Sequence, residues 1–215
     1  MFSIILRILK VVFVLTLPFL ALLRGATYLH GHYELSPMLS IIGGMLISGV
    51  VLLLYITLIY ERLTDRLGGV RAFKNRSFFV LIILLGFCAH GLFFISSANL
   101  KDPSLSQEIR DMHPILRLSI STIILLDKDL IVTDASRVAH DYKQMNLPTP
   151  KSSLHYKQKD GYVYAVDLRT TGRSELRNIL LRGYFKIIGL RTIRHVGTAD
   201  HLHVSLLLPE RPYAK

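Results

Sequence analysis

The chain has a single cysteine, Cys88, and no tryptophan among its 215 residues. One cysteine cannot form a disulfide within the chain, so a disulfide-stapled scaffold is excluded. Acidic residues are also few: 15 Asp and Glu stand against 26 Lys and Arg, which gives a formal net charge of +11. This balance favours anionic partners such as lipid headgroups and acidic polymers. Because the basic residues are dispersed and form no recognisable binding motif, we expect no nucleic-acid partner.

Charge is missing altogether from two long stretches. No Asp, Glu, Lys or Arg occurs from Met38 to Tyr60 or from Ser77 to Leu100. Each stretch exceeds the roughly 20 apolar residues that cross a bilayer as a helix. A third stretch, Ile4 to Leu23, carries Arg7 and Lys10 only near its start, where long side chains can reach the headgroups. We therefore predict three transmembrane helices, over about residues 4–23, 38–60 and 77–98.

Orientation follows from the segment between the second and third helices. Residues 61–76 hold five Lys or Arg, so this short loop is expected to stay in the cytoplasm. The N-terminus is then cytoplasmic too, while the loop from Arg24 to Pro37 and everything after Leu100 lie outside. The sequence thus predicts a membrane domain, residues 1–100, and an extracytoplasmic domain, residues 101–215.

Polar and small residues inside the membrane part suggest packing rather than chemistry. Gly44 and Ser48, four residues apart, predict close packing of the second helix, either within this chain or with a membrane partner. His30 and His32 share His-x-His spacing, but in a loop at the membrane face we interpret them as interfacial.

The outer domain shows both helical and strand patterns, which predicts an α+β fold with an antiparallel sheet. In chain order we expect a helix over 106–112, a hairpin of strands 121–126 and 130–133, a helix over 134–145 capped by Asp134, a strand over 162–168, a helix over 175–188 ended by Gly189, and strands over 190–195 and 201–207.

Histidines gather near the C-terminus. His195, Asp200, His201 and His203 lie within nine positions, and residues two apart on a strand point to one face. Val204, Leu206 and Leu208 would then point the other way, toward a core. Two upstream motifs, Ser153-Leu154-His155 and Ala165-Val166-Asp167, add another His and an Asp. Two His and one Asp form a plausible three-ligand set for a catalytic zinc, with the fourth position left to water.

These motifs resemble those of the LAS-type zinc peptidases, which include D-alanyl-D-alanine carboxypeptidases and phage endolysin endopeptidases. Their signature reads Ser-x-His, then Ala-x-Asp, then an acidic residue three positions before a final His. The resemblance covers roughly the last hundred residues and none of the membrane part. The family has about seven positions from the first His to the Asp, whereas His155 and Asp167 are twelve apart (167 − 155). We expect an inserted turn at residues 157–161, since loops tolerate insertions.

The resemblance implies a role for each matching residue. His155, Asp167 and His203 would bind Zn²⁺, and Asp200 would act as the base, with His201 as its rival.

An arginine upstream of the first ligand would polarise the scissile carbonyl; Arg137 is the first candidate and Arg117 the second. Ser153 would contact substrate or support a ligand, and His140 and His195 would be structural.

The function implied is that of a multi-pass protein of the bacterial cytoplasmic membrane, whose outer domain is a zinc-dependent peptidase. It would hydrolyse peptide bonds in peptidoglycan stem peptides or crosslinks, and the bond cut stays open. Peptidoglycan peptide and membrane lipid are the expected partners. Two alternatives remain: a wall-binding module that has lost catalysis, and a membrane-complex subunit whose helices carry the function.

Overall fold

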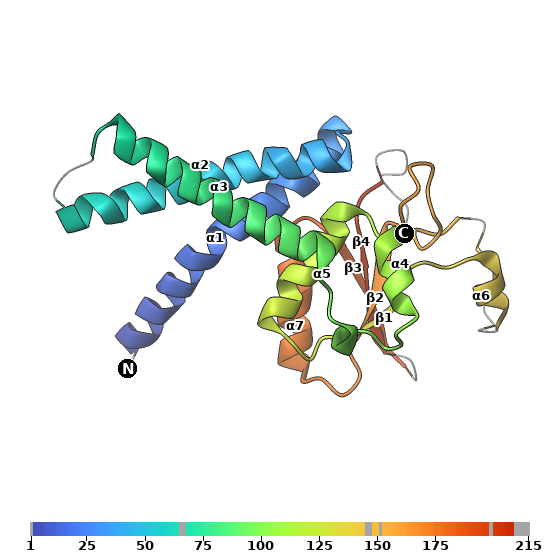
Figure 1. Cartoon of the computed structure of the whole chain (residues 1–215). Coiled ribbons are helices and arrows are strands. Elements are labelled where there is room, and N and C mark those ends of the chain that lie inside the picture. The colour runs from blue at the N-terminus through green and yellow to red at the C-terminus, as the bar shows by residue number, and fades with distance from the viewer. Residues whose placement is uncertain (1, 65–67, 145–147, 151, 198–199, 209–215) are drawn as a thin grey trace.

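The computed structural model describes residues 2–64, 68–144, 148–150, 152–197 and 200–208. Three long helices come first, and a four-stranded antiparallel sheet with shorter helices follows (Figure 1). The chain therefore has the predicted α+β composition.

The long helices are α1 (Phe2–Tyr33), α2 (Pro37–Thr64) and α3 (Val70–Phe93). All three are long and apolar enough to cross a membrane. The predicted loop over 24–37 is mostly wrong, because α1 continues to Tyr33 and leaves only three residues before α2. A Cβ at Gly44 would lie 2.3 Å from the carbonyl oxygen of Leu22, so α2 packs tightly on α1 within this chain.

The sheet has the strand order β1-β2-β4-β3. Its strands are β1 (Val132–Asp134), β2 (Ala165–Arg169), β3 (Arg191–His195) and β4 (His201–Ser205). Two helices, α5 (Pro114–Leu126) and α7 (Glu175–Ile187), lie on one side of it (Figure 1). Leu202 and Val204 of β4 are fully buried, as the alternation along this strand predicts.

The hairpin predicted over residues 121–133 is wrong in its first half, because those residues continue helix α5. Pro114 occupies the first helical turn, and the side chain of His113 accepts a hydrogen bond from the backbone N–H of Ile115. Both are signals of a helix start, and they outweigh the β-branched residues that follow. Only the second run becomes a strand, β1.

The helix predicted over 134–145 is also wrong in its first turn. Asp134 ends β1, and helix α6 spans only Ala139–Gln144. The backbone N–H groups of Ala135 and Ser136 donate to the carboxylate of Glu108, on helix α4 (Leu105–Asp111). This contact keeps the chain extended after β1.

Helix α5 joins the outer domain to the long helices. The Ser121 hydroxyl donates to the carbonyl of Gly91 in α3, at 2.8 Å. A Cβ at Gly91 would lie 2.3 Å from a methyl carbon of Leu118, so the two helices touch closely. At the end of α1, the hydroxyl of Thr27 donates to the carbonyl of Ile188, just after α7. The outer domain thus packs directly on the ends of the helices.

Candidate metal centre

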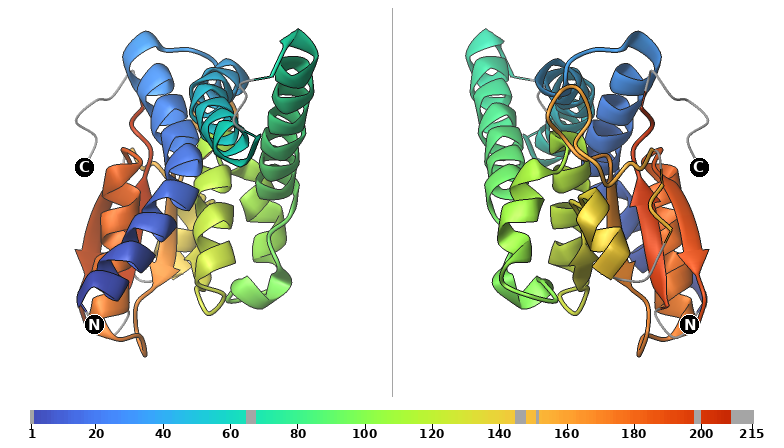
Figure 2. Two further views of the ribbon diagram at one scale, coloured as in Figure 1. Left: turned by 90° about the vertical axis from the view of Figure 1, so that its left-hand side faces the viewer. Right: turned by 90° about the vertical axis from the view of Figure 1, so that its right-hand side faces the viewer.

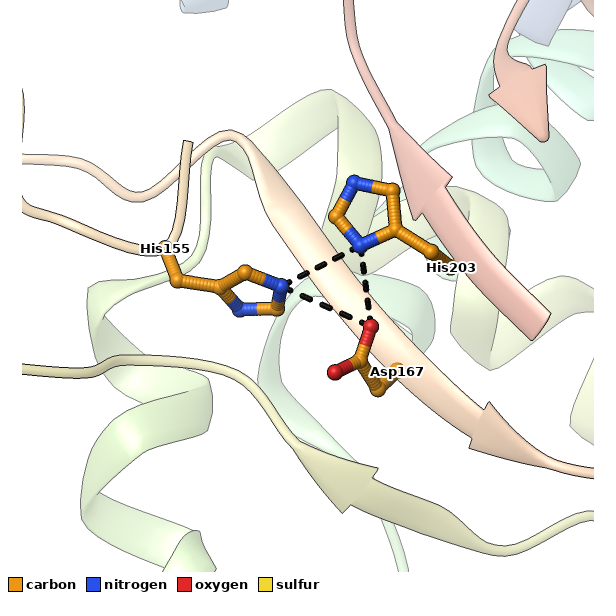
Figure 3. A group of neighbouring side chains, drawn as sticks. All are labelled: His155, Asp167 and His203. Carbon is orange, nitrogen blue, oxygen red and sulfur yellow. Dashed lines mark hydrogen bonds and ion pairs between the residues drawn. The ribbon is translucent and has the colours of Figure 1, made fainter. Parts of the chain in front are cut away.

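Three side chains, from β2, β4 and the loop before β2, converge on one face of the sheet (Figure 3). Nε2 of His155 lies 3.2 Å from Nδ1 of His203 and 3.4 Å from Oδ1 of Asp167. Nδ1 of His203 lies 2.9 Å from the same Asp167 oxygen. Two histidine nitrogens and one carboxylate oxygen therefore form a compact triangle.

The sheet register explains two corners of this triangle. Asp167 on β2 and His203 on β4 are direct cross-strand partners. Side chains of directly opposite residues stand on the same face, with Cβ atoms about 5 Å apart. The pairing of two antiparallel strands thus fixes the distance between these ligand groups.

His155 arrives from a loop outside the sheet. Leu154 is buried and its carbonyl accepts a hydrogen bond from the N–H of Tyr164, which ties the loop to the start of β2. Between them the chain turns back: the N–H of Gly161 donates to the carbonyl of Gln158, and Gly161 has φ of 83°. This turn accommodates the long spacing between His155 and Asp167.

A backbone contact decides which nitrogen of His155 faces the centre. Its Nδ1 lies 2.7 Å from the carbonyl oxygen of Ala135, which can only accept, so Nδ1 carries the proton. Nε2 then presents a lone pair toward Asp167 and His203. A histidine held in this way by a carbonyl is the usual arrangement for a metal ligand.

The three donor atoms fit a zinc ion. Ligands about 2.0–2.1 Å from a tetrahedral zinc stand about 3.3 Å apart, and the three separations here run from 2.9 to 3.4 Å. His155 and Asp167 are both at least 97% buried, so the atoms are held in place by their surroundings. The donor set is one that zinc prefers.

The second oxygen of Asp167 is already neutralised. Its Oδ2 accepts a hydrogen bond from Nη2 of Arg137 at 2.6 Å, and Nε of Arg137 donates to Asp134 at 2.9 Å. Burial by itself raises the pKa of Asp167, but the neighbouring His155 and His203 outweigh it and hold that pKa well below its usual range. Asp167 is therefore a carboxylate, with one oxygen on Arg137 and the other on the centre.

The centre opens into a large cavity of about 1180 Å³. Metal sites that are closed by four protein ligands are structural, whereas a site with three ligands and access from solvent suits catalysis. Beyond the triangle, the cavity wall includes Lys101, Arg169, His195, Asp200 and His201.

The two predicted candidates for the base are placed differently. The Asp200 carboxylate accepts hydrogen bonds from the hydroxyl of Thr170 at 2.6 Å and from Nη2 of Arg194 at 2.9 Å. Hydrogen bonds from Arg194 and Thr170 lower the pKa of Asp200 to about 2. Nε2 of His201, in contrast, lies 3.8 Å from Oδ2 of Asp167, beside the centre.

The other predicted site residues divide between the cavity and places outside it. Arg137 and Ser153 line the cavity, but the Ser153 hydroxyl contacts Tyr142 and accepts from the N–H of His155. Arg117 is elsewhere, donating to the backbone carbonyls of Leu92 and Arg110.

Sequence reasoning missed two contributors and undervalued a third. Asp134 and Tyr142 hold Arg137, the first by an ion pair and the second with its ring 5.4 Å from the guanidinium carbon. His195, predicted to be structural, stacks on His201 in the cavity wall, with ring centroids 4.8 Å apart. A signal for His195 was available, because antiparallel pairing around the turn between β3 and β4 places it opposite His201.

Comparison of the whole chain with protein-family models, with curated proteins and with solved structures gives no match.

Proposed function

We propose that the protein is a membrane-anchored, zinc-dependent peptidase that hydrolyses peptide bonds in peptidoglycan stem peptides or crosslinks. One observation carries the proposal: three donor atoms of His155, Asp167 and His203 converge, at the spacing of a zinc site, in the wall of an open cavity. The wall-peptide substrate rests on the resemblance of the motifs to LAS-type peptidases.

The chemistry supplied by zinc at such a site is activation of a water molecule near neutral pH. Among the chain's own groups, we assign proton transfer to His201, because its Nε2 lies beside the centre, 3.8 Å from Oδ2 of Asp167, whereas the carboxylate of Asp200 is engaged by Arg194. A group with a pKa of about 2 takes up a proton poorly near neutral pH. Asp200 then holds the guanidinium of Arg194 in place, from the segment between β3 and β4.

Arg137 is the group that meets developing negative charge. Its guanidinium is fixed by Asp134 and Asp167, and its side chain keeps 16% of its surface exposed in the cavity wall. A prealigned cation stabilises a developing oxyanion without the cost of reorganisation. Ser153 holds the backbone of His155 and so supports a ligand, rather than binding substrate.

The size and charge of the cavity fit a peptide. Small-molecule sites occupy about 300–1,000 Å³, whereas this cavity has about 1180 Å³ and Lys101 and Arg169 in its wall. These cations suit the carboxylates of an acidic stem peptide.

The proposal places the outer domain beyond the cytoplasmic membrane of a bacterium. Residues 61–76, with five Lys or Arg, include the end of α2 and the start of α3 and favour the cytoplasm. If α3 crosses from there, the domain that follows it lies on the side where the wall is found.

A wall-binding module without turnover is the second candidate. It is favoured by the hydrogen bonds of Asp200 and Ser153, which engage two of the predicted working groups with other protein atoms. In that case Arg137 would grip a peptide rather than help to cut it.

The test uses the full-length protein in detergent. We expect about one zinc ion per chain by elemental analysis, and amine release from muropeptides that stops when a chelator removes the metal. His203→Ala should lose both zinc and release, while His140→Ala, which alters a histidine on α6, should keep both.

Zinc binding without release from any muropeptide would support the binding module instead. Absence of zinc, or a reporter fused after Lys215 that is active only in the cytoplasm, would exclude the wall peptidase.

A further inference from the structure

Helix α7 is apolar on two opposite faces. Its inner face packs on the sheet through Leu181 and Phe185, which are at most 2% exposed. A helix that covers a sheet normally presents polar side chains on its other face. Here that outer face carries Leu176, Ile179, Leu180 and Ile187, with exposures of 54% to 66%.

The outer residues form one continuous stripe. At 100° per residue, these four side chains fall within an arc of about 100°, centred opposite the inner face. Cationic residues border it: Arg182 and Lys186 on one side and Arg177 on the other. We call this surface, the four apolar residues with Arg182 and Lys186, the α7 stripe.

The end of α5 extends the α7 stripe. Leu125 and Leu126 are exposed, at 49% and 71%. The residue that follows them, Asp127, forms ion pairs with Arg173 and Arg177. These pairs hold the C-terminal end of α5 against the start of α7.

The position of α7 relative to the long helices indicates what covers the stripe. In Figure 1, α7 lies on the side of the sheet that faces the long helices and runs across the direction of α2 and α3. Seen from that side, the N-terminal half of α1 passes in front of α7 (Figure 2). A bilayer crossed by α2 and α3 would therefore have its surface roughly parallel to α7.

We propose that the α7 stripe lies in the outer surface of the bilayer, with its apolar residues among the upper acyl chains and Arg182 and Lys186 at anionic headgroup phosphates. The proposal rests on the membrane-crossing part of the proposed function and does not depend on peptidase activity. An apolar helix face bordered by cations is the pattern of an interfacial helix. The long helices tether the domain, so lipid is always within reach of the stripe.

This docking would orient the catalytic domain. His203 alternates along β4 with Leu202 and Val204, which belong to the same core as Phe185 of α7. The candidate metal centre therefore lies on the sheet face opposite α7. A domain seated on the bilayer through α7 would turn its cavity away from the membrane, toward a wall substrate.

The test places a fluorescent label at single cysteines in the full-length protein. Cys88, the only cysteine, is first replaced by Ala. An environment-sensitive dye is then attached at Leu180→Cys in the stripe, at Val138→Cys as an exposed apolar control next to α6, or at Leu54→Cys in α2. Each protein is reconstituted in phosphatidylcholine vesicles, with or without phosphatidylglycerol, that carry quenchers at shallow or deep acyl positions.

We expect the Leu180 label to be blue-shifted and quenched by shallow quenchers, the Leu54 label by deep ones, and the Val138 label by neither. Phosphatidylglycerol should increase quenching at Leu180, and Arg182→Gln with Lys186→Gln should remove that increase.

Quenching at Leu54 without quenching at Leu180 overturns the docking proposal and leaves membrane crossing intact. Absence of quenching at both overturns membrane crossing, and the docking with it. A blue shift at Leu180 without lipid quenching assigns the stripe to a second copy of the chain.

Discussion

Among the close histidine pairs in the described part of the chain, two stand in opposite surroundings. The rings of His155 and His203 have centroids 5.1 Å apart, in the wall of an open cavity. The rings of His30 and His113 have centroids 4.6 Å apart, where the end of α1 meets the start of α5. Closeness of two imidazoles is therefore not what distinguishes a metal centre.

The carboxylate makes the difference. Between His155 and His203 stands Asp167, whose charge is maintained by the hydrogen bonds around it. Within the described part of the chain, neither His30 nor His113 has a carboxylate in ion-pair contact. Three lone-pair donors that face a cavity suit a cation, whereas two buried rings without a carboxylate suit packing.

His30 and His113, which we call the junction pair, present opposite hydrogen-bonding groups at Nε2. Nδ1 of His113 accepts from the N–H of Ile115, so its proton sits on Nε2. Nδ1 of His30 faces the carbonyl oxygen of Leu35 and must donate, so its Nε2 is an acceptor. Both Nε2 atoms are buried without a hydrogen-bond partner among the described residues. The junction therefore holds one buried donor and one buried acceptor, on rings whose centroids are 4.6 Å apart.

Removal of the carboxylate beside His155 and His203, which we call the open pair, should have the strongest effect on metal binding. Asp167→Asn removes the carboxylate that contacts both histidines. Changing a residue that merely supports a ligand costs about 10–100-fold in metal affinity, so we expect loss of this ligand to cost at least about 100-fold. Competition with a zinc chelator measures this.

Asp160→Asn is the matched control for this variant. Asp160 accepts hydrogen bonds from the N–H of Tyr162 and the hydroxyl of Tyr164, so it belongs to the turn after His155 rather than to the triangle. Unchanged zinc affinity in Asp167→Asn would show that the carboxylate is not a ligand.

His201 and Asp200, the two candidate bases, should differ in how much their loss lowers the rate. His201→Ala should keep zinc and lower the rate of peptide hydrolysis by about 10²–10⁴, the usual cost of losing a general base. Asp200→Ala should lower the rate less, because the Asp200 carboxylate holds Arg194 rather than taking a proton itself. Steady-state rates of amine release on one muropeptide compare the two variants, with His195→Phe to report the cost of disturbing the stacked ring. The opposite ranking would assign the proton transfer to Asp200.

The sequence predicted most reliably those features that depend on neighbouring residues alone. Apolar runs, two of them without any charge, marked the three long helices, and residues 175–188, 190–195 and 201–207 were predicted close to the observed α7, β3 and β4. Each of these segments has either a continuous apolar run or a regular period that tertiary contacts do not alter.

The segments that misled depend on distant contacts. The Ser, Thr and Ile residues after Pro114 suit a strand, yet Ser121 bonds to Gly91 and the segment packs as a helix against α3. The residues after Asp134 suit a helix, but their N–H groups bond to Glu108, 27 and 28 residues away. Neither partner can be identified from the local pattern.

The residues of the candidate site also divide into those that a local pattern predicts and those that depend on distant contacts. The spacing of His201 and His203 on one strand predicts a shared face, and the register with Asp167 follows from strand pairing. The carbonyl of Ala135 that orients His155, and the engagement of Asp200 by Arg194, come from loops whose paths the sequence does not reveal. The grouping of His155, Asp167 and His203 was thus accessible from the sequence, whereas the engagement of Asp200 by Arg194 was not.

The smallest predicted effect concerns the junction pair and its dependence on pH. Burial first, and then the neighbouring His30, lower the pKa of His113 well below its ordinary value of 6.5. The other titratable groups that face His113 are Tyr162 and Tyr164, with ring centroids at 5.7 and 4.8 Å. Tyrosines ordinarily titrate near about pH 10, so they stay neutral in acid.

The lowered pKa of His113 determines the direction in which stability changes with pH. The unfolded chain binds a proton near the ordinary pKa, whereas the folded protein resists it, so this contribution to stability is complete above 6.5 and declines as the pH falls below it. His113→Phe removes a helix cap worth about 1 kcal/mol, but it also removes a buried donor whose missing partner costs about 1–3 kcal/mol. Stability at neutral pH should therefore change little, while the loss on acidification becomes smaller.

Thermal unfolding of the full-length protein in detergent, at roughly pH 7.5 and 5.5, measures both quantities. His140→Phe, at a histidine that contacts Gln144 on the exposed surface of α6, should keep the wild-type dependence. If His113→Phe lost as much stability in acid as the wild type, the junction pair would not be a neutral contact, and its difference from the metal centre would have to lie in access to solvent rather than in charge.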